Sequence, residues 1–293
     1  MKKVIKKTSD NAVVGMVSAV LIIGLIVAVI SIIQVVYVPI IMEQREAEHM
    51  DVVAKEFASL TSVIDNQAAD GRTGVPIPTF VTLGNKELPF LVSSKAFGSL
   101  EILYNPLLDN ACAITVTNSS GSQTFPLGVI TYSSDNAYYL EQSYTYEAGA
   151  MIVSQSQGNM MMVPPFFFID YNESKQPPLT ITFDVVNISS VGNKTIASGF
   201  GTYPIQTEFD TISSNITFIN VSRMTISTPY SNAWFVFINR SLLRTGLNPD
   251  GKLTLTDTQK ALQLDVVLPD YFPINVILRI VEIKAQIGPG WIN

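Results

Sequence analysis

The chain has 293 residues, with 18 Lys and Arg against 24 Asp and Glu, and a net charge of −6. An acidic chain of this kind binds nucleic acid poorly, so we expect no nucleic-acid partner. Cys112 is the only cysteine and His49 the only histidine. These counts exclude an intrachain disulfide, a histidine-rich metal site and any Ser–His or Cys–His catalytic pair that lacks His49.

The N-terminal segment predicts a single membrane-spanning helix. Residues 1–11 form a basic leader, and residues 12–33 contain no charged side chain. At about 1.5 Å per residue this apolar stretch makes a helix of roughly 33 Å, enough to cross the hydrocarbon core of a bilayer. The lysines are expected to hold the leader in the cytoplasm and to place the C-terminal domain outside the cell, anchored in the cell membrane. The leader's basic residues are Lys2, Lys3, Lys6 and Lys7.

We predict that this transmembrane segment, taken as residues 12–41, is retained. A cleaved signal peptide has an apolar core of about 7–15 residues and a small-x-small cleavage site. The segment here is longer, and residues 34–39 contain no Ala-x-Ala pattern. Pro39 is expected to kink or end the helix nearby, because it lacks an amide donor and clashes with the preceding turn.

Residues 42–68 predict an extracytoplasmic amphipathic helix. Its apolar residues are spaced 3, 4, 3 and 4 apart, which is typical of one helix face. This face could pack on the protein's own globular head or form a seam with neighbouring copies, and two heptads do not decide between them. His49, beside Glu46 and Glu48, is expected to be solvated. The apolar face consists of Met50, Val53, Phe57, Leu60 and Ile64.

A Gly- and Pro-rich linker at residues 69–78 precedes a β-rich ectodomain at residues 79–293. Short β-branched and aromatic runs separated by turn residues predict an antiparallel β-sandwich. A change in composition at Pro164 and Pro165 suggests two subdomains, divided near residues 164–178. One short inserted helix is predicted at residues 231–246, and residues 274–284 predict a strand buried on both faces. The fold class is therefore α+β.

The chain carries few residues with catalytic character. It contains no Gly-rich phosphate loop, no nucleophile elbow and no HExxH motif. Acidic pairs are frequent on an acidic surface, where they are usually only solvated. We therefore predict that the protein is not an enzyme and uses neither a cofactor nor a metal.

N-x-Ser/Thr sequons are more frequent than chance in the ectodomain. They predict a glycoprotein whose sugars shield the edges of the sheets. Asn-rich turns beside Thr-rich strands can produce the same pattern without modification. The predicted acceptors are Asn118, Asn172, Asn187, Asn193, Asn215 and Asn220, and Asn239 lies in a weaker sequon within the predicted helix.

A cluster of tyrosines is the richest aromatic patch in the chain. Tyrosine side chains combine a flat ring with a hydroxyl, which suits the recognition of glycans or proteins. Alternatively, the rings cover one face of a sheet and stabilise it. Tyr139 and Tyr144 are the residues proposed for recognition. The whole cluster is Tyr132, Tyr138, Tyr139, Tyr144 and Tyr146.

The N-terminal 65 residues resemble a known class of surface protein. The basic leader, residues 10–21 and the unbroken apolar helix are similar to the N-termini of archaeal type IV pilins and archaellins. Residues 37–50, with Phe57, Leu60 and residues 64–65, also resemble archaeal surface proteins with a pilin-like N-terminus. The resemblance implies cleavage by a prepilin peptidase after Ala12, which leaves Val13 as the new N-terminus.

Two functions remain open from the sequence. In the first, the chain is a pilin-like structural subunit, a minor pilin or pseudopilin, which self-assembles or joins other pilin-like subunits. In the second, it is a monomeric membrane-anchored surface domain that binds envelope glycans or proteins. Because a helix that is apolar on all sides suits both a filament core and a lipid anchor, the sequence does not separate these functions.

Overall fold

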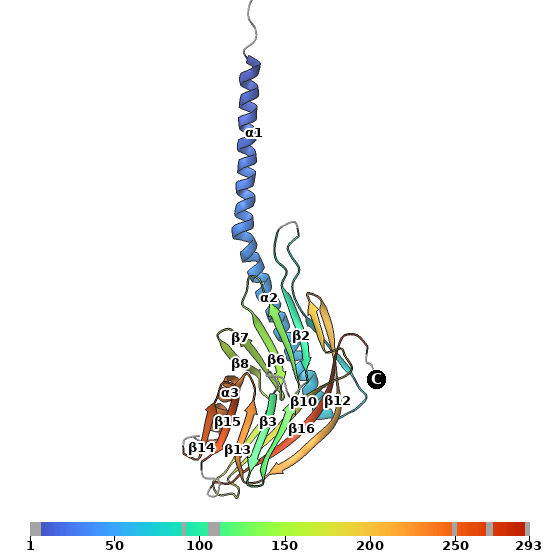
Figure 1. Cartoon of the computed structure of the whole chain (residues 1–293), viewed down its shortest axis with the longest axis vertical. Helices are drawn as coiled ribbons and strands as arrows, with labels where there is room; N and C mark the ends of the chain where they lie inside the picture. The colour runs from blue at the N-terminus through green and yellow to red at the C-terminus, as the bar shows by residue number, and fades with distance from the viewer. Residues whose placement is uncertain (1–6, 90–91, 105–111, 248–250, 268–271, 291–293) are drawn as a thin grey trace, which may run out of the picture.

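The computed structural model describes residues 7–89, 92–104, 112–247, 251–267 and 272–290. A long helical rod projects from a β-rich head (Figure 1). The head is built mostly from antiparallel strand pairs. The predicted α+β class, with one long apolar N-terminal helix followed by a large β-sheet domain, is confirmed at this level.

The first three helical elements of the chain form one uninterrupted helical segment. Helix α1 (Lys7–Ile32) passes through a π-helical turn, η1 (Ile33–Tyr37), into helix α2 (Val38–Asp70). Within η1 the Val38 N–H donates to the carbonyl of Ile33, five residues earlier. The wider turn accommodates Pro39, which lies in the first turn of α2 and has no N–H to donate. Pro39 therefore does not end the helix.

Helix α2 lies along the head and ends at Gly71. Gly71 adopts φ = 64° and its N–H donates to the Gln67 carbonyl, which is a left-handed C-cap that glycine favours. The predicted apolar face is fully or almost fully buried against the strands of the head: Met50, Val53, Phe57, Leu60 and Ile64. The helix thus packs on its own head, and this face is not a seam between copies.

The described strands of the head form three sheets. The shared sheet has the order β1 (Ile77–Thr82), β12 (Thr202–Phe218), β16 (Ile274–Ile287), β10 (Leu179–Ser190), β9 (Phe166–Tyr171), and only its β10–β16 pair is parallel. The proximal sheet has the order β11 (Ile196–Gly199), β2 (Phe97–Leu103), β5 (Val129–Asp135), β6 (Gln142–Glu147), β7 (Ala150–Gln155), β8 (Gly158–Val163). The distal sheet has the order β14 (Leu253–Asp257), β15 (Ala261–Val266), β13 (Val221–Ser227), β3 (Cys112–Asn118), β4 (Gly121–Leu127). Helix α3 (Ser231–Arg244) connects β13 to β14.

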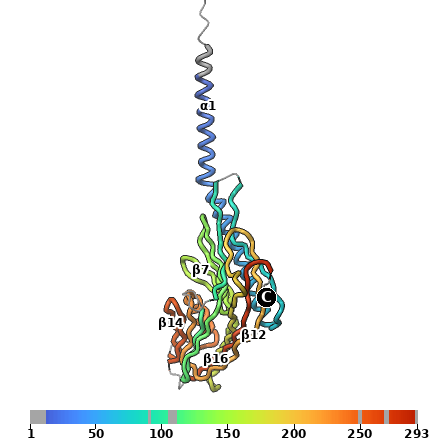
Figure 2. Tube along the Cα trace, turned by 45° about the vertical axis from the view of Figure 1, so that its right-hand side comes forward, coloured from blue at the N-terminus to red at the C-terminus, as the bar shows by residue number. Residues whose placement is uncertain are grey.

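Long strands of the shared sheet contribute to two hydrophobic cores. In β16, Ile274 to Ile280 alternate into a core with the distal sheet and α3, whereas Val281 to Ile287 alternate into a core with α2 and the proximal sheet. The fully buried face changes between Ile280 and Val281, and the side chains on the opposite face are mostly half-buried, so the predicted burial of both faces of this strand is found only in part. Each core takes residues from both sides of residues 164–178, so the cores are not successive parts of the chain. Figure 2 shows β16 and β12 running side by side along the length of the head.

Candidate functional site

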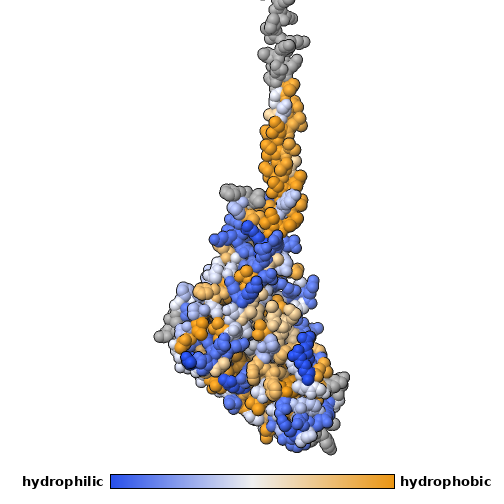
Figure 3. All heavy atoms as spheres, turned by 180° about the vertical axis from the view of Figure 1, so that it is seen from behind, coloured by the Kyte–Doolittle hydropathy of each residue, from blue (hydrophilic) through white to orange (hydrophobic). Residues whose placement is uncertain are grey.

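Among the described residues, the most extensive exposed apolar surface is the rod, which we define as residues 13–37. Every large apolar side chain in it is between 37% and 73% exposed, on all sides of the helix. Figure 3 shows the rod covered by apolar side chains, above a largely hydrophilic region of the head. By its length and composition this single helix can cross a membrane. An apolar surface of this extent requires either lipid or other protein around it.

Exposure on all sides of the helix ends where the head begins. Val38 and Met42 are buried in a small cluster with Leu88 and the half-buried Tyr138. The side chain of Gln34, one turn earlier, donates to the Val92 carbonyl. Loops of the head therefore cover one side of the helix from η1 onward, whereas the large apolar side chains of residues 13–37 stay exposed to another environment.

Glu46 joins helix α2 to the loop between β5 and β6. Its fully buried carboxylate accepts hydrogen bonds from the backbone N–H groups of Ala137 (3.2 Å), Tyr138 (2.7 Å) and Tyr139 (2.7 Å). Hydrogen bonds to an ionised acceptor are among the stronger ones in proteins. Sequence reasoning missed this contact. The available signal was that Glu46 lies four residues after Met42 and four before Met50, on the buried face.

His49 and Glu56 hold strand β1 against the same helix. His49 is buried and its Nε2 lies 3.0 Å from the Thr82 carbonyl oxygen, so the expectation of a solvated histidine is wrong. Burial lowers the pKa of His49, although the Thr82 carbonyl and nearby Glu56 oppose that shift. Glu56 accepts the Thr82 N–H at 2.7 Å and the Thr82 hydroxyl at 2.9 Å. Together with Glu46, these contacts fix the direction of α2 relative to the head.

Glu147 is a second buried carboxylate, between β6 and α3. Trp234 Nε1–H donates to it at 2.7 Å, and the Thr228 hydroxyl donates at 2.8 Å. Burial raises the pKa of Glu147 to about 7, and these two hydrogen bonds oppose the shift. The contacts connect the proximal sheet to α3. Among the described residues, no group of three or more His, Cys, Asp or Glu side chains is arranged to hold a metal ion.

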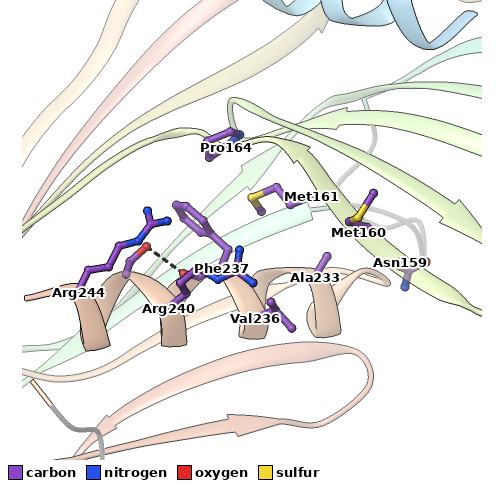
Figure 4. Close-up of a pocket in the computed structure, with 10 residues that line it drawn as sticks. Asn159, Met160, Met161, Pro164, Ala233, Val236, Phe237, Arg240 and Arg244 are labelled. Carbon is purple, nitrogen blue, oxygen red and sulfur yellow. Dashed lines mark hydrogen bonds between the residues drawn. The ribbon is translucent and has the colours of Figure 1, made fainter. Parts of the chain in front are cut away.

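A groove of about 390 Å³ runs between α3 and the end of β8. Figure 4 shows Phe237 and Arg244 projecting from α3 toward the side that carries Met161 and Pro164. Arg240 lies one turn before Arg244. Neither guanidinium forms an ion pair with another described residue. The groove therefore combines an apolar surface with two uncompensated positive charges, in a chain that is acidic overall.

The predicted glycosylation acceptors differ in how far their side chains are exposed. Asn187 is buried, its Nδ2 donates to Glu282 at 2.8 Å, and its Oδ1 accepts the Gly128 N–H at 2.7 Å. The prediction is therefore wrong for Asn187, because the Nδ2 atom that would carry a sugar is buried and hydrogen-bonded to Glu282. Asn118 is half-buried and its Nδ2 donates to the Ile219 carbonyl at 3.3 Å. The remaining acceptors are exposed: Asn172, Asn193, Asn215 and Asn220.

The tyrosine cluster does not form a single exposed patch. Tyr132, Tyr144 and Tyr146 are buried, and the Tyr144 hydroxyl donates to the Met50 carbonyl at 3.3 Å. The Phe57 ring of α2 packs against Tyr132 and Tyr144, with centroids 6.4 and 6.0 Å apart. Tyr144 is thus a core residue, which corrects its assignment to a recognition surface. Tyr139 is half-buried beside the same core.

The predicted processing position lies within the first helix. Ala12 and Val13 are both helical residues of α1, and the Val13 side chain is exposed. Helix α1, to which they belong, projects away from the head in Figure 1. The structure therefore separates this position from the buried carboxylates and the groove.

Comparisons with known proteins give a family without an assigned activity. No curated protein matches the chain, and no solved structure matches it. The model of a family of unknown function, DUF7289, matches residues 12–261, which include the whole rod, α2, α3 and the larger part of the head. The chain therefore belongs to the DUF7289 family.

Proposed function

We propose that the chain is a pilin-like structural subunit of the cell surface, in the role of a minor pilin or pseudopilin, without catalytic activity. The observation that carries the proposal is the unbroken passage of the apolar rod into α2, whose opposite end is embedded in the core of the head. A flexible linker after the membrane segment would leave the head free to reorient. Here the helix that would pack in a filament also sets the position of the head.

The surface of the rod suits both stages of such an assembly. In lipid, a helix satisfies its own backbone groups and needs only apolar side chains outside. In a filament, the same side chains would be buried against the rods of other copies. In this proposal the leader stays in the cytoplasm, the head is extracellular, and cleavage after Ala12 exposes Val13. In the same proposal, the three sheets and α3 form a glycosylated β-sandwich with an inserted helix, exposed on the surface of an archaeal cell.

Shearing of whole cells, followed by high-speed sedimentation, tests the proposal. We expect the chain to be released by shear and to sediment as an assembly. Gly15 and Gly24 leave open space beside the rod, so Gly15→Leu and Gly24→Leu keep an apolar helix that can enter a membrane. Larger side chains would disturb close helix–helix contacts. We therefore expect these variants to remain in the membrane but to lose sedimentation, whereas Val27→Leu, a milder change on the same rod, should retain it.

The alternative is a monomeric membrane-anchored surface domain that binds envelope glycans or proteins. It would replace the first proposal if wild-type chain were recovered only by detergent extraction, as a monomer. It would also predict that the glycine variants and Val27→Leu behave alike, because lipid accommodates all three side chains.

A further inference from the structure

We propose that the open face of the shared sheet holds carbohydrate, and that this carbohydrate is the N-linked oligosaccharide on Asn215 of the same chain. The inference rests on the proposed function, because it takes the head to be glycosylated and exposed at the cell surface. It adds the surface on which one of these sugars lies. That surface is the face of a sheet, not an edge.

The shared sheet buries one face and leaves the other open. On the buried face, Phe183 of β10 and Leu278 of β16 pack in the core with the distal sheet and α3. Side chains alternate along a strand, so the residues between them point to the opposite face. On β9 that opposite face carries Phe166 and Phe168, which are 63% and 60% exposed. Two large apolar rings side by side on an open surface favour a partner that removes them from water.

Strand pairing places a glycan acceptor in line with one of these rings. On β12, Asn215 lies opposite Arg279 of β16. Arg279 lies in turn opposite Asp184 of β10, with its Nη1 2.9 Å from the Asp184 carboxylate. On β9, Phe166 lies opposite Asp184. Neighbouring strands are about 4.8 Å apart, so the line from Asn215 to Phe166 is roughly 14 Å long, which an oligosaccharide of a few rings can span.

The acceptor itself faces the open side of the sheet. Ile216 and Phe218 of β12 pack in the core with the distal sheet and α3. Asn215 and Thr217 alternate with them, so they point to the open face, and both are exposed. These two residues are the first and last of one N-x-Thr sequon. A sugar attached to Asn215 therefore starts on the open face, next to Arg279.

The rest of the line has the chemistry of a carbohydrate site. Phe166, Asp184 and Arg279 line a hollow of about 620 Å³, and Asp65 of α2 lines its other side. A pyranose packs the C–H groups of its face on an aromatic ring, and its hydroxyls hydrogen-bond carboxylates and guanidinium groups. The side chains of the Arg279–Asp184 pair are still 32% and 25% exposed, so both can also bond hydroxyls. Because their charges compensate each other, the pair suits a neutral sugar better than an ion.

Removal of the sequon tests the inference on the full chain isolated from its own cells. Thr217→Val removes the hydroxyl that the sequon requires and keeps a β-branched side chain, whereas Thr217→Ser keeps the sequon. Glycopeptide mass spectrometry establishes whether Asn215 carries a sugar. Hydroxyl-radical labelling, also read by mass spectrometry, measures the accessibility of the Phe166 ring. We expect labelling of Phe166 to rise severalfold in Thr217→Val and to stay at the wild-type level in Thr217→Ser.

Two controls show that the change is local. Phe80 is the matched reporter, because it is 56% exposed on β1 of the same sheet. Its partner Pro204 is 11 residues before Asn215 on β12, which is roughly 35 Å along the strand. Labelling of Phe80 should be the same in every variant. Asn193→Gln, which removes another exposed sequon, should leave Phe166 protected.

Thermal unfolding tests whether Phe166 itself holds the sugar. Thr217→Ser retains the sugar and Thr217→Val does not, so the difference between their melting temperatures includes the contact with the ring. Adding Phe166→Ala to both chains should shift this difference by about 2–4 °C against Thr217→Ser, because the sugar then has no ring on which to pack.

Three outcomes would overturn the inference. The first is an Asn215 that carries no sugar. The second is equal labelling of Phe166 in Thr217→Ser and Thr217→Val, because the sugar then lies elsewhere or another partner, such as a second copy, covers the face. The third is a melting difference that Phe166→Ala does not change. In all three the chain could still be released by shear and sediment, so the filament role would stand. A chain that fails to sediment while its sugar protects Phe166 would overturn the filament role alone.

Discussion

Replacing Phe57 with Ala tests whether the head holds its helix through the buried face of α2. Phe57 is fully buried in the core between α2 and the proximal sheet, in contact with the rings of Tyr132 and Tyr144. Truncation of a buried phenylalanine costs about 3–5 kcal/mol, through lost apolar burial and the cavity left behind. For a domain of this size that corresponds to a fall of about 6–20 °C in the melting temperature.

The assay is thermal and denaturant unfolding of the full chain in detergent, followed by near-ultraviolet circular dichroism. Phe168→Ala is the matched control, because it removes the same atoms from a strand position that is 60% exposed. We expect the control to change the free energy of unfolding by less than about 1 kcal/mol. If the Phe57→Ala protein had the same melting temperature as the Phe168→Ala control, the attachment of α2 would not depend on this core.

Three further predictions address the buried polar groups. Burial raises the pKa of Glu147 to about 7, above its value in the unfolded chain, so its protonation stabilises the fold at low pH. That contribution is lost as the pH rises through about 7, so the free energy of unfolding should fall between about pH 5 and pH 8. Glu147→Gln should reduce this fall. A pH dependence identical to that of the wild-type protein would contradict the prediction. Glu46→Ala leaves three N–H groups without their acceptor and should cost about 1–3 kcal/mol, with faster amide exchange at residues 137–139 but not in β7. Glycopeptide mass spectrometry should find no sugar on Asn187, and modification there would show that this part of the shared sheet is not folded as described.

Some of the structure could be predicted from the sequence because it depends on local periodicity. The rod follows from a long stretch without charge, and the buried face of α2 follows from apolar residues at helical spacing. The end of α2 follows from Gly71, which adopts the left-handed conformation without a steric penalty. In each case the residues that decide the structure are neighbours in the chain.

The remainder depends on contacts between distant segments. Glu46 and His49 belong to a helix with many exposed charges, and only the loop at residues 137–139 and strand β1 explain their burial. Asn187 is indistinguishable from the other sequons until Gly128 and Glu282 are placed beside it. Tyr144 alternates along its strand as a surface tyrosine would, but α2 covers that face of the sheet. Tertiary packing, which a single sequence does not record, decides these residues.

The groove illustrates the same limit for functional residues. The sequence places Arg240 and Arg244 in a short predicted helix, but no sequence pattern places them near Met160 and Pro164. Only the folded chain shows that neither arginine forms an ion pair with an acidic side chain of the described residues.

Identifying the mature N-terminus of the chain in the sheared surface fraction would show most directly whether the chain is a pilin-like subunit. Intact-mass and N-terminal peptide mass spectrometry can identify it without any variant. A pilin-like subunit is expected to begin at Val13, after removal of the leader that ends at Ala12. A chain that begins at Met1 or Lys2, found only in the membrane fraction, would contradict the claim and leave a plain membrane anchor.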